Sequence, residues 1–230
     1  MKLATYQNFL DRVDELGFML FMSSGCRTLP VMFEEASNKG AWTGDPDIDP
    51  WCWKDRAAEE KKLAYGCILG GQKGFVSARM YPYFYIAYQP EEFMEERWAS
   101  GLINQTTWQL WQLFEKKNSL DTSEIRREMG VTRKSGGSRV DASILELQRD
   151  YYITVAGHRC KVNRHGQPYG WPSCIYELVT SWAPADWLTG ISSISPEEAR
   201  EKILDVGMAM GKFSSREDLA DALCLESKLK

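Results

Sequence analysis

The sequence predicts an α+β protein, and three observations support this fold class. Amphipathic helical stripes recur along the chain, for example over residues 5–16 and 196–210. Short apolar runs bounded by turn residues, typical of antiparallel strands, lie between them at residues 63–69 and 75–78. The 230 residues are 43 % hydrophobic and 26 % charged, which is an ordinary globular composition.

Residues 1–90 are expected to form an N-terminal mixed α/β domain. A helix begins after Thr5, a good N-cap residue, and ends at Gly17. Asp49-Pro50 marks a second helix start, because an aspartate cap precedes a proline that needs no N–H. Apolar runs and turn residues predict the rest: a strand over 18–22, a short helix from Pro30 to Ala36, a polar loop over 38–49, strands over 63–69 and 75–78, and an aromatic segment over 81–88 that fits helix or strand.

Residues 91–182 are expected to form a second domain with three helices and a hairpin. An acidic helix over 90–99 leads into it. The elements then follow in order: a helix with Ile103, Thr107, Leu110, Trp111 and Phe114 on one face; a turn over 118–121; a short helix capped by Thr122; a helix capped by Ser138 with Val140, Ile144, Leu147 and Tyr151 inward; and strands over 153–162 and 171–181. This order is that of a winged helix-turn-helix.

Residues 183–230 are expected to form a C-terminal helical segment. Ser195-Pro196-Glu197-Glu198 is a capping box with proline in the first turn. A further helix starts near Ser214.

Positive charge is concentrated between Arg126 and Arg164, where nine Lys and Arg face four Asp and Glu. This stretch carries +5 within a chain of net charge −4, so it attracts polyanions while the rest repels them. Double-stranded DNA is the predicted partner, and an adaptor that uses the same module for protein contacts is the alternative. The candidate DNA-binding residues are Arg126, Arg127, Arg133, Lys134, Ser138, Arg139, Ser143, Arg149, His158, Arg159, Lys161, Arg164, His165 and Gln167.

Three tryptophans beside Asp49 form the second candidate site. Trp42, Trp51 and Trp53 are residues on which a nucleobase can stack. The alternative is that these side chains anchor the core.

Several other chemistries lack their sequence signatures. His158, Cys160, His165 and Cys174 gather on the hairpin without the spacing of a zinc site, so no metal is predicted. The chain has no P-loop, and its two histidines make a hydrolase triad hard to assemble, so no cofactor is predicted. No signal peptide or membrane-spanning run is evident, and the six cysteines are expected to be reduced, as in the cytoplasm. The oligomeric state stays open.

Six short motifs resemble bacterial proteins of the AlkZ-related family, over roughly residues 10–210. They are Thr43-Gly44-Asp45, Asp49-Pro50-Trp51-Cys52-Trp53-Lys54, Ala64-Tyr65-Gly66, Gly74-Phe75-Val76-Ser77, Tyr81-Pro82-Tyr83-Phe84 and Gly166-Gln167-Pro168-Tyr169-Gly170-Trp171. The resemblance implies a winged-helix protein distantly similar to the AlkZ DNA glycosylases, which excise alkylated bases and unhook crosslinks. It therefore implies DNA binding and a role in DNA repair.

The AlkZ enzymes activate water with a Gln-x-Gln motif, and this chain contains none. The resemblance therefore leaves open whether the protein is an enzyme, and its catalytic residues are unknown. If it is a glycosylase with a different catalytic site, a carboxylate must orient water or stabilise the sugar cation. Asp49 and Glu59 are the candidates nearest to the tryptophans.

Overall fold

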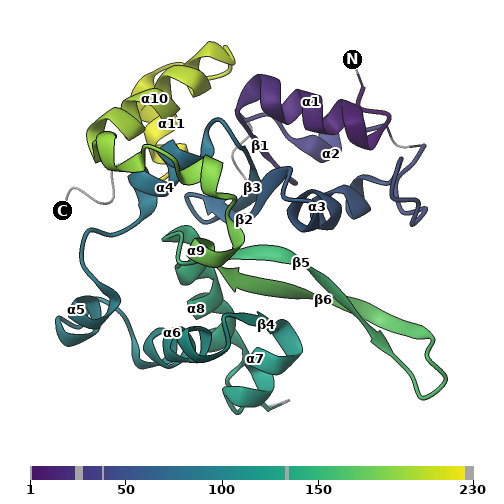
Figure 1. Ribbon diagram of the computed structural model, residues 1–230. Helices are drawn as coiled ribbons and strands as arrows, with labels where there is room; N and C mark the ends of the chain where they lie inside the picture. The colour runs from purple at the N-terminus through teal and green to yellow at the C-terminus, as the bar shows by residue number, and fades with distance from the viewer. Residues whose placement is uncertain (1, 24–27, 38, 133–134, 226–230) are drawn as a thin grey trace. The chain divides into compact units, whose positions relative to one another are not determined.

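The computed structural model describes residues 2–23, 28–37, 39–132 and 135–225, and it shows an α+β protein (Figure 1). The chain divides into two units, residues 1–89 with 183–230, and residues 90–182. Each unit contains one three-stranded sheet with antiparallel pairings. The predicted α+β fold class is confirmed.

The sheet of the first unit has the order β1-β3-β2. Helix α1 ends at Gly17 as predicted, and Asp49 caps α3 as predicted. The segment over 81–88, which fitted helix or strand, is helical. The elements of this part are α1 (Tyr6–Leu16), β1 (Phe18–Leu20), α2 (Met32–Glu35), α3 (Pro50–Glu59), β2 (Leu63–Leu69), β3 (Gln72–Ser77) and α4 (Tyr81–Tyr88).

Aromatic rings fill the core of this unit. Phe9 of α1 meets Phe75 of β3 edge-on at 4.8 Å and stacks on Trp53 of α3 at 5.6 Å between ring centroids. Three predicted elements differ in their bounds. Strand β1 ends at Leu20 instead of residue 22, and β3 covers Gln72–Ser77 instead of residues 75–78. Helix α2 begins at Met32 and not at Pro30. The backbone N–H of Leu20 donates to the carbonyl of Pro30, which holds that residue beside β1 instead of in the helix.

The C-terminal helices pack with residues 1–89. They are α10 (Pro196–Ala209) and α11 (Arg216–Ala222), preceded by short 3₁₀ turns at Ala185–Leu188 and Ile191–Ser193. The predicted capping box is present, because Ser195 Oγ accepts from the N–H of Glu198 and the Glu198 carboxylate accepts from the N–H of Ser195. After α11, the Leu223 carbonyl accepts a hydrogen bond from Tyr88 Oη at 2.5 Å, which joins this segment to α4.

We expect Gly70→Ala to destabilise the first unit. A Cβ at Gly70 would lie 2.3 Å from the Leu223 carbonyl oxygen, and the residue has φ +63°. Gly44→Ala is the matched control, because Gly44 has φ +75° but no neighbour within 4 Å of its Cβ position. Urea unfolding should show a loss of about 1 kcal/mol for the strained control and a clearly larger loss for Gly70→Ala. Equal losses would contradict the close approach to Leu223.

The second unit contains helices and a long hairpin. They are α5 (Met94–Ala99), α6 (Gln105–Lys117), β4 (Ser119–Asp121), α7 (Thr122–Glu128), α8 (Gly137–Arg149), β5 (Ile153–Val162), β6 (Pro168–Leu178) and α9 (Val179–Trp182). Its sheet has the order β4-β6-β5. The core lies between the sheet and the helices, with Leu110, Phe114, Ile125 and Leu147 at its centre.

Several predictions for this unit are wrong in detail. The acidic helix predicted over 90–99 begins only at Met94, because the Glu96 carboxylate accepts from the N–H of Phe93 and caps the helix there. Ile103 is buried but precedes α6, which Asn104 caps. The predicted turn over 118–121 is strand β4, which pairs with β6. The second helix is capped by Asp121, whose carboxylate accepts from the N–H groups of Ser123 and Glu124, and not by Thr122. The third helix begins at Gly137, before Ser138, because the chain turns at Gly136 with φ +91°, a conformation that favours glycine. The last strand covers Pro168–Leu178, three residues earlier than the predicted 171–181.

Candidate nucleic-acid interface

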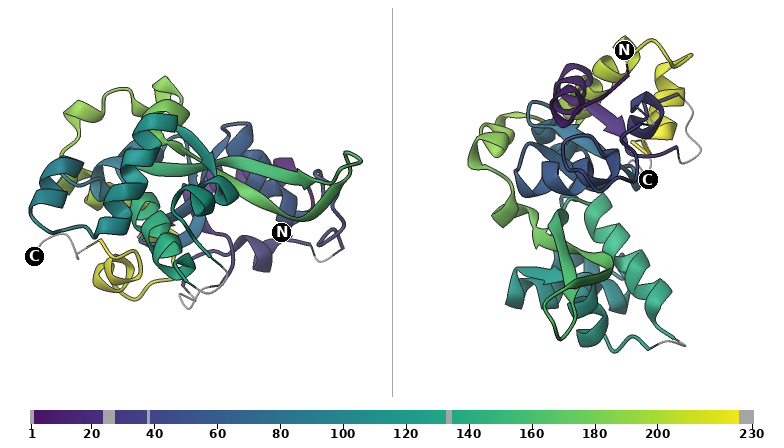
Figure 2. Two further views of the ribbon diagram at one scale, coloured as in Figure 1. Left: turned by 90° about the horizontal axis from the view of Figure 1, so that it is seen from below. Right: turned by 90° about the vertical axis from the view of Figure 1, so that its right-hand side faces the viewer.

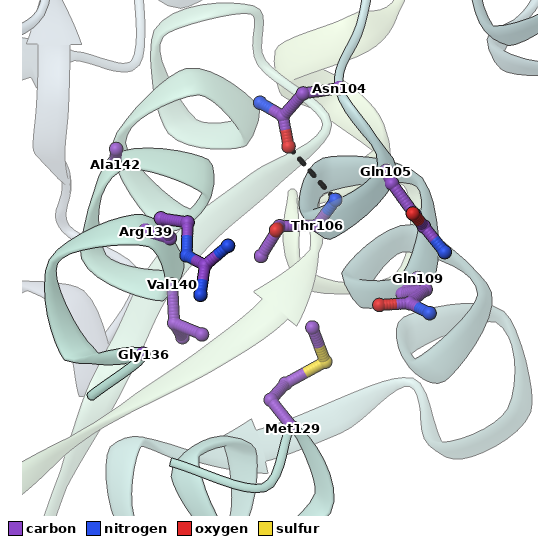
Figure 3. Close-up of a pocket in the computed structure, with 9 residues that line it drawn as sticks. All are labelled: Asn104, Gln105, Thr106, Gln109, Met129, Gly136, Arg139, Val140 and Ala142. Carbon is purple, nitrogen blue, oxygen red and sulfur yellow. Dashed lines mark hydrogen bonds between the residues drawn. The ribbon is translucent and has the colours of Figure 1, made fainter. Parts of the chain in front are cut away.

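A hollow of about 530 Å³ lies between α6 and α8 of the second unit (Figure 3). Its lining comes mainly from the start of both helices, and Met129, which follows α7, adds an apolar side chain. The residues are Asn104, Gln105, Thr106, Gln109, Met129, Gly136, Arg139, Val140 and Ala142. Figure 3 shows the guanidinium of Arg139 extending from α8 into this space. Arg139 was predicted from the sequence, whereas Gln105 and Gln109 were not, because nothing in the sequence places α6 opposite the start of α8.

The predicted contact face of α8 is only partly exposed. Ser138 and Arg139 lie at the surface, as expected for contact residues. Ser143 is wholly buried, and its hydroxyl is hydrogen-bonded to the hydroxyl of Thr107 at 2.9 Å. Thr107 also pairs with Glu146 of α8 at 2.6 Å. Ser143 therefore joins α8 to α6 and has no surface left for DNA, which corrects its assignment as a contact residue.

Several of the clustered cations are already paired with carboxylates. Arg126 donates to both oxygens of Asp141, and Arg127 lies 3.6 Å from Glu128. Arg149 pairs with Asp150 at 2.9 Å, and Arg159 pairs with Asp121 at 2.8 Å. The pairs Arg126–Asp141 and Arg127–Glu128 are exposed, so each stabilises the fold by only about 0–1 kcal/mol. In the other two pairs the carboxylate, of Asp150 or Asp121, is buried.

Two arginines of the stretch remain available. Within the described residues, the structure records no carboxylate within 4.0 Å of Arg139 or Arg164. Arg164 donates instead to Nε2 of His165 at 3.0 Å, at the tip of the hairpin. Arg133 and Lys134 lie outside the described residues, as does the side chain of Lys161.

The β5–β6 hairpin extends beyond the helices of its own unit (Figures 1 and 2). Its tip is ordered by Asn163, whose side-chain oxygen accepts from the N–H groups of His165 and Gln167. His165 and Gln167 are exposed, whereas His158 is half-buried. Val162 and Tyr169 are also exposed there, and neither was predicted as a contact residue. They are exposed because the third strand, β4, is short. It pairs only with Ile175–Glu177 of β6 and leaves the far end of the hairpin uncovered.

Two segments of this unit contain no acidic residue. Residues 90–182 contain twelve Lys and Arg and twelve Asp and Glu, so the unit as a whole is neutral. No Asp or Glu occurs over 129–140, which lead into α8, or over 151–176, which form most of the hairpin. Four of the acids cluster instead in and before α5, at Glu91, Glu92, Glu95 and Glu96. The positive field is therefore local to the start of α8 and the hairpin.

The three tryptophans of the first unit differ in burial. Trp53 is wholly buried against Phe9, so it is a core anchor and cannot stack a base. Trp51 is half-buried and Trp42 is exposed. Asp49 is buried, and its carboxylate accepts from the backbone N–H groups of Trp51 at 2.9 Å and Gly44 at 2.8 Å.

These contacts give Asp49 a structural role as a helix cap. Glu59, the other candidate carboxylate, is exposed in the last turn of α3. Among the residues that the structure describes, no three His, Cys, Asp or Glu side chains are grouped so that they could hold a metal ion. Within the same part of the chain, no helix has both the length and the apolar character needed to cross a bilayer.

Comparison with known proteins identifies a family. Neither the curated proteins nor the solved structures gave a significant match. The model of the family described as AlkZ related matches residues 3–223, which is nearly the whole chain. The protein therefore belongs to the AlkZ-related family.

Proposed function

We propose that residues 90–182 form a winged helix-turn-helix that binds double-stranded DNA. In this assignment α7 and α8 are the helix-turn-helix, α8 is the recognition helix and the β5–β6 hairpin is the wing. One observation carries the proposal: the two acid-free basic segments, 129–140 and 151–176, coincide with the start of α8 and with the hairpin. These are the elements that enter the groove and follow the backbone in such modules.

The start of α8 suits a phosphate. Gly136 occupies the N-cap and has no side chain that could accept from the first N–H groups of the helix, and no described side chain caps them. Uncapped N–H groups at a helix start can donate to an anion. Arg139 lies in the first turn, and the amides of Gln105 and Gln109 line the same hollow. Exposed pairs such as Arg126–Asp141 are weak enough for the arginine to exchange its carboxylate for a phosphate.

Membership of the AlkZ-related family supports a role in DNA repair. We infer that the bound DNA carries alkylation or crosslink damage. Base excision is not part of the proposal, because the chain lacks Gln-x-Gln and Asp49 is committed to capping α3.

Fluorescence anisotropy with a labelled duplex tests the proposal. We expect binding at 50 mM salt that weakens about 40-fold by 200 mM if three phosphates are neutralised. A folded protein that does not bind duplex at 50 mM salt would contradict the proposal and favour the adaptor alternative. A duplex of the same sequence carrying N-methylated purines should bind more tightly, and equal affinity would remove the link to damage.

A further inference from the structure

The loop between α2 and α3 presents a tryptophan to solvent. Trp42 is 61 % exposed. Its ring lies 5.9 Å from Phe33 and 5.0 Å from Trp51, centroid to centroid. We call these three residues the Trp42 cluster. Phe33 and Trp51 pack against Trp42, so its aromatic ring is held at the surface of the first unit.

This presentation is not explained by stability. Trp42 has φ +63°, a conformation that costs a residue other than glycine about 1 kcal/mol or more. The loop maintains it with its own hydrogen bonds, since Thr43 Oγ1 donates to the Gly40 carbonyl and the N–H of Gly44 donates to Asp49. A strained backbone that exposes a large apolar ring points to a ligand for that ring.

Two neighbouring aromatic rings already hold cations of the chain itself. The Nζ of Lys54 lies 4.6 Å from the centroid of Trp51 and pairs with Asp55. The guanidinium carbon of Arg56 lies 4.1 Å from the centroid of Tyr6, and Arg56 pairs with Asp47. In both cases a cation sits over an aromatic face beside a carboxylate, which is a favourable arrangement.

The outer face of Trp42 is open to a cation from outside the chain. Asp45, an exposed carboxylate, lies three residues along the same loop, and the structure records no cation over the Trp42 ring among the described residues. Residues 39–60 contain six Asp and Glu against three Lys and Arg, so the surrounding charge is negative. That charge repels the phosphates of a nucleic acid and attracts a cation.

We propose that the Trp42 cluster binds a cationic side chain, arginine or methylated lysine, of a partner protein. The cation lies over the outer face of Trp42 and is paired by Asp45. This site belongs to the first unit, and it is independent of DNA binding by the second. It replaces the base-stacking role that the sequence suggested for Trp42 and Trp51.

Anisotropy titration of the full chain with a dye-labelled Gly-Arg repeat peptide tests this site. The matched control peptide carries citrulline, which has nearly the shape of arginine but no charge. We expect the arginine peptide to bind, the citrulline peptide to bind at least several-fold more weakly, and Trp42→Ala to weaken arginine-peptide binding about 2- to 5-fold. Trp42→Phe should retain part of the affinity, and Asp45→Asn should lose part of it.

Three results would overturn the proposal. They are no binding of the arginine peptide, equal binding of the two peptides, or binding unchanged in Trp42→Ala. An oligothymidylate that binds more tightly than the peptide, and only when Trp42 is present, would also overturn it in favour of base stacking. Urea unfolding of Trp42→Phe, which keeps an aromatic ring, controls for a general loss of structure.

Discussion

Replacing Asp150 with asparagine is expected to lower the free energy of unfolding by about 3–5 kcal/mol. Asp150 is 1 % exposed and follows α8 directly. Its carboxylate lies 2.9 Å from the guanidinium of Arg97, which is also buried, and 2.9 Å from that of Arg149. Asparagine keeps the size of the side chain but leaves the Arg97 charge buried without its counter-ion.

Urea denaturation of Asp150→Asn measures this effect, and Asp141→Asn is the matched control. Asp141 also pairs with an arginine at 2.9 Å, but both side chains are about half exposed. Water therefore solvates Arg126 when the carboxylate is lost, and the expected change is below about 1 kcal/mol. Equal stabilities of the two variants would show that the Arg97–Asp150 pair does not support the second unit.

The second large effect is expected on DNA affinity. Arg139→Gln combined with Arg164→Gln should weaken duplex binding at 50 mM salt about 10- to 100-fold. Because each lost phosphate contact reduces the slope of log K against log salt by about 0.9, the double variant should reduce the slope by about 1.8. Titration of a labelled duplex at four salt concentrations gives both quantities.

The choice of these two arginines follows from their surroundings. Arg159 belongs to the same basic stretch, but its guanidinium binds Asp121, the cap of α7, so its replacement would also disturb that helix. The control is Lys62→Gln in the first unit. Lys62 is exposed and lies far along the chain from the basic stretch, so its replacement should leave the slope unchanged. An unchanged slope in the double variant would exclude Arg139 and Arg164 from phosphate contact.

Local signals in the sequence predicted the helix starts that depend on a few neighbouring residues. Thr5 and Asp49-Pro50 begin α1 and α3, and the Ser195 capping box begins α10. Each signal works because the capping oxygen and the N–H groups that it accepts lie within three residues of each other. The start of α8 was missed because a left-handed glycine, Gly136, turns the chain before Ser138 can cap it.

Burial of polar residues was not predictable in this way. The periodic stripe Val140, Ile144 and Leu147 was correctly placed inward, but the same periodicity put Ser143 at the surface. The hydroxyl of Thr107, 36 residues away in sequence, accompanies Ser143 in the core. An apolar stripe indicates which face of a helix is buried. It does not show that a polar residue beside the stripe is also buried when a residue distant in sequence supplies its hydrogen bond.

By itself, the sequence determined the α+β class, the starts of α1, α3 and α10, and the concentration of cations between Arg126 and Arg164. Only the tertiary structure decided which cations are neutralised, since Arg126 meets Asp141 and Arg159 meets Asp121 across separate elements. It also decided that Trp53 is core while Trp42 faces solvent. The physical reason is one of range: caps and stripes depend on neighbours within a few residues, whereas burial and charge pairing depend on contacts that exist only after the chain has folded.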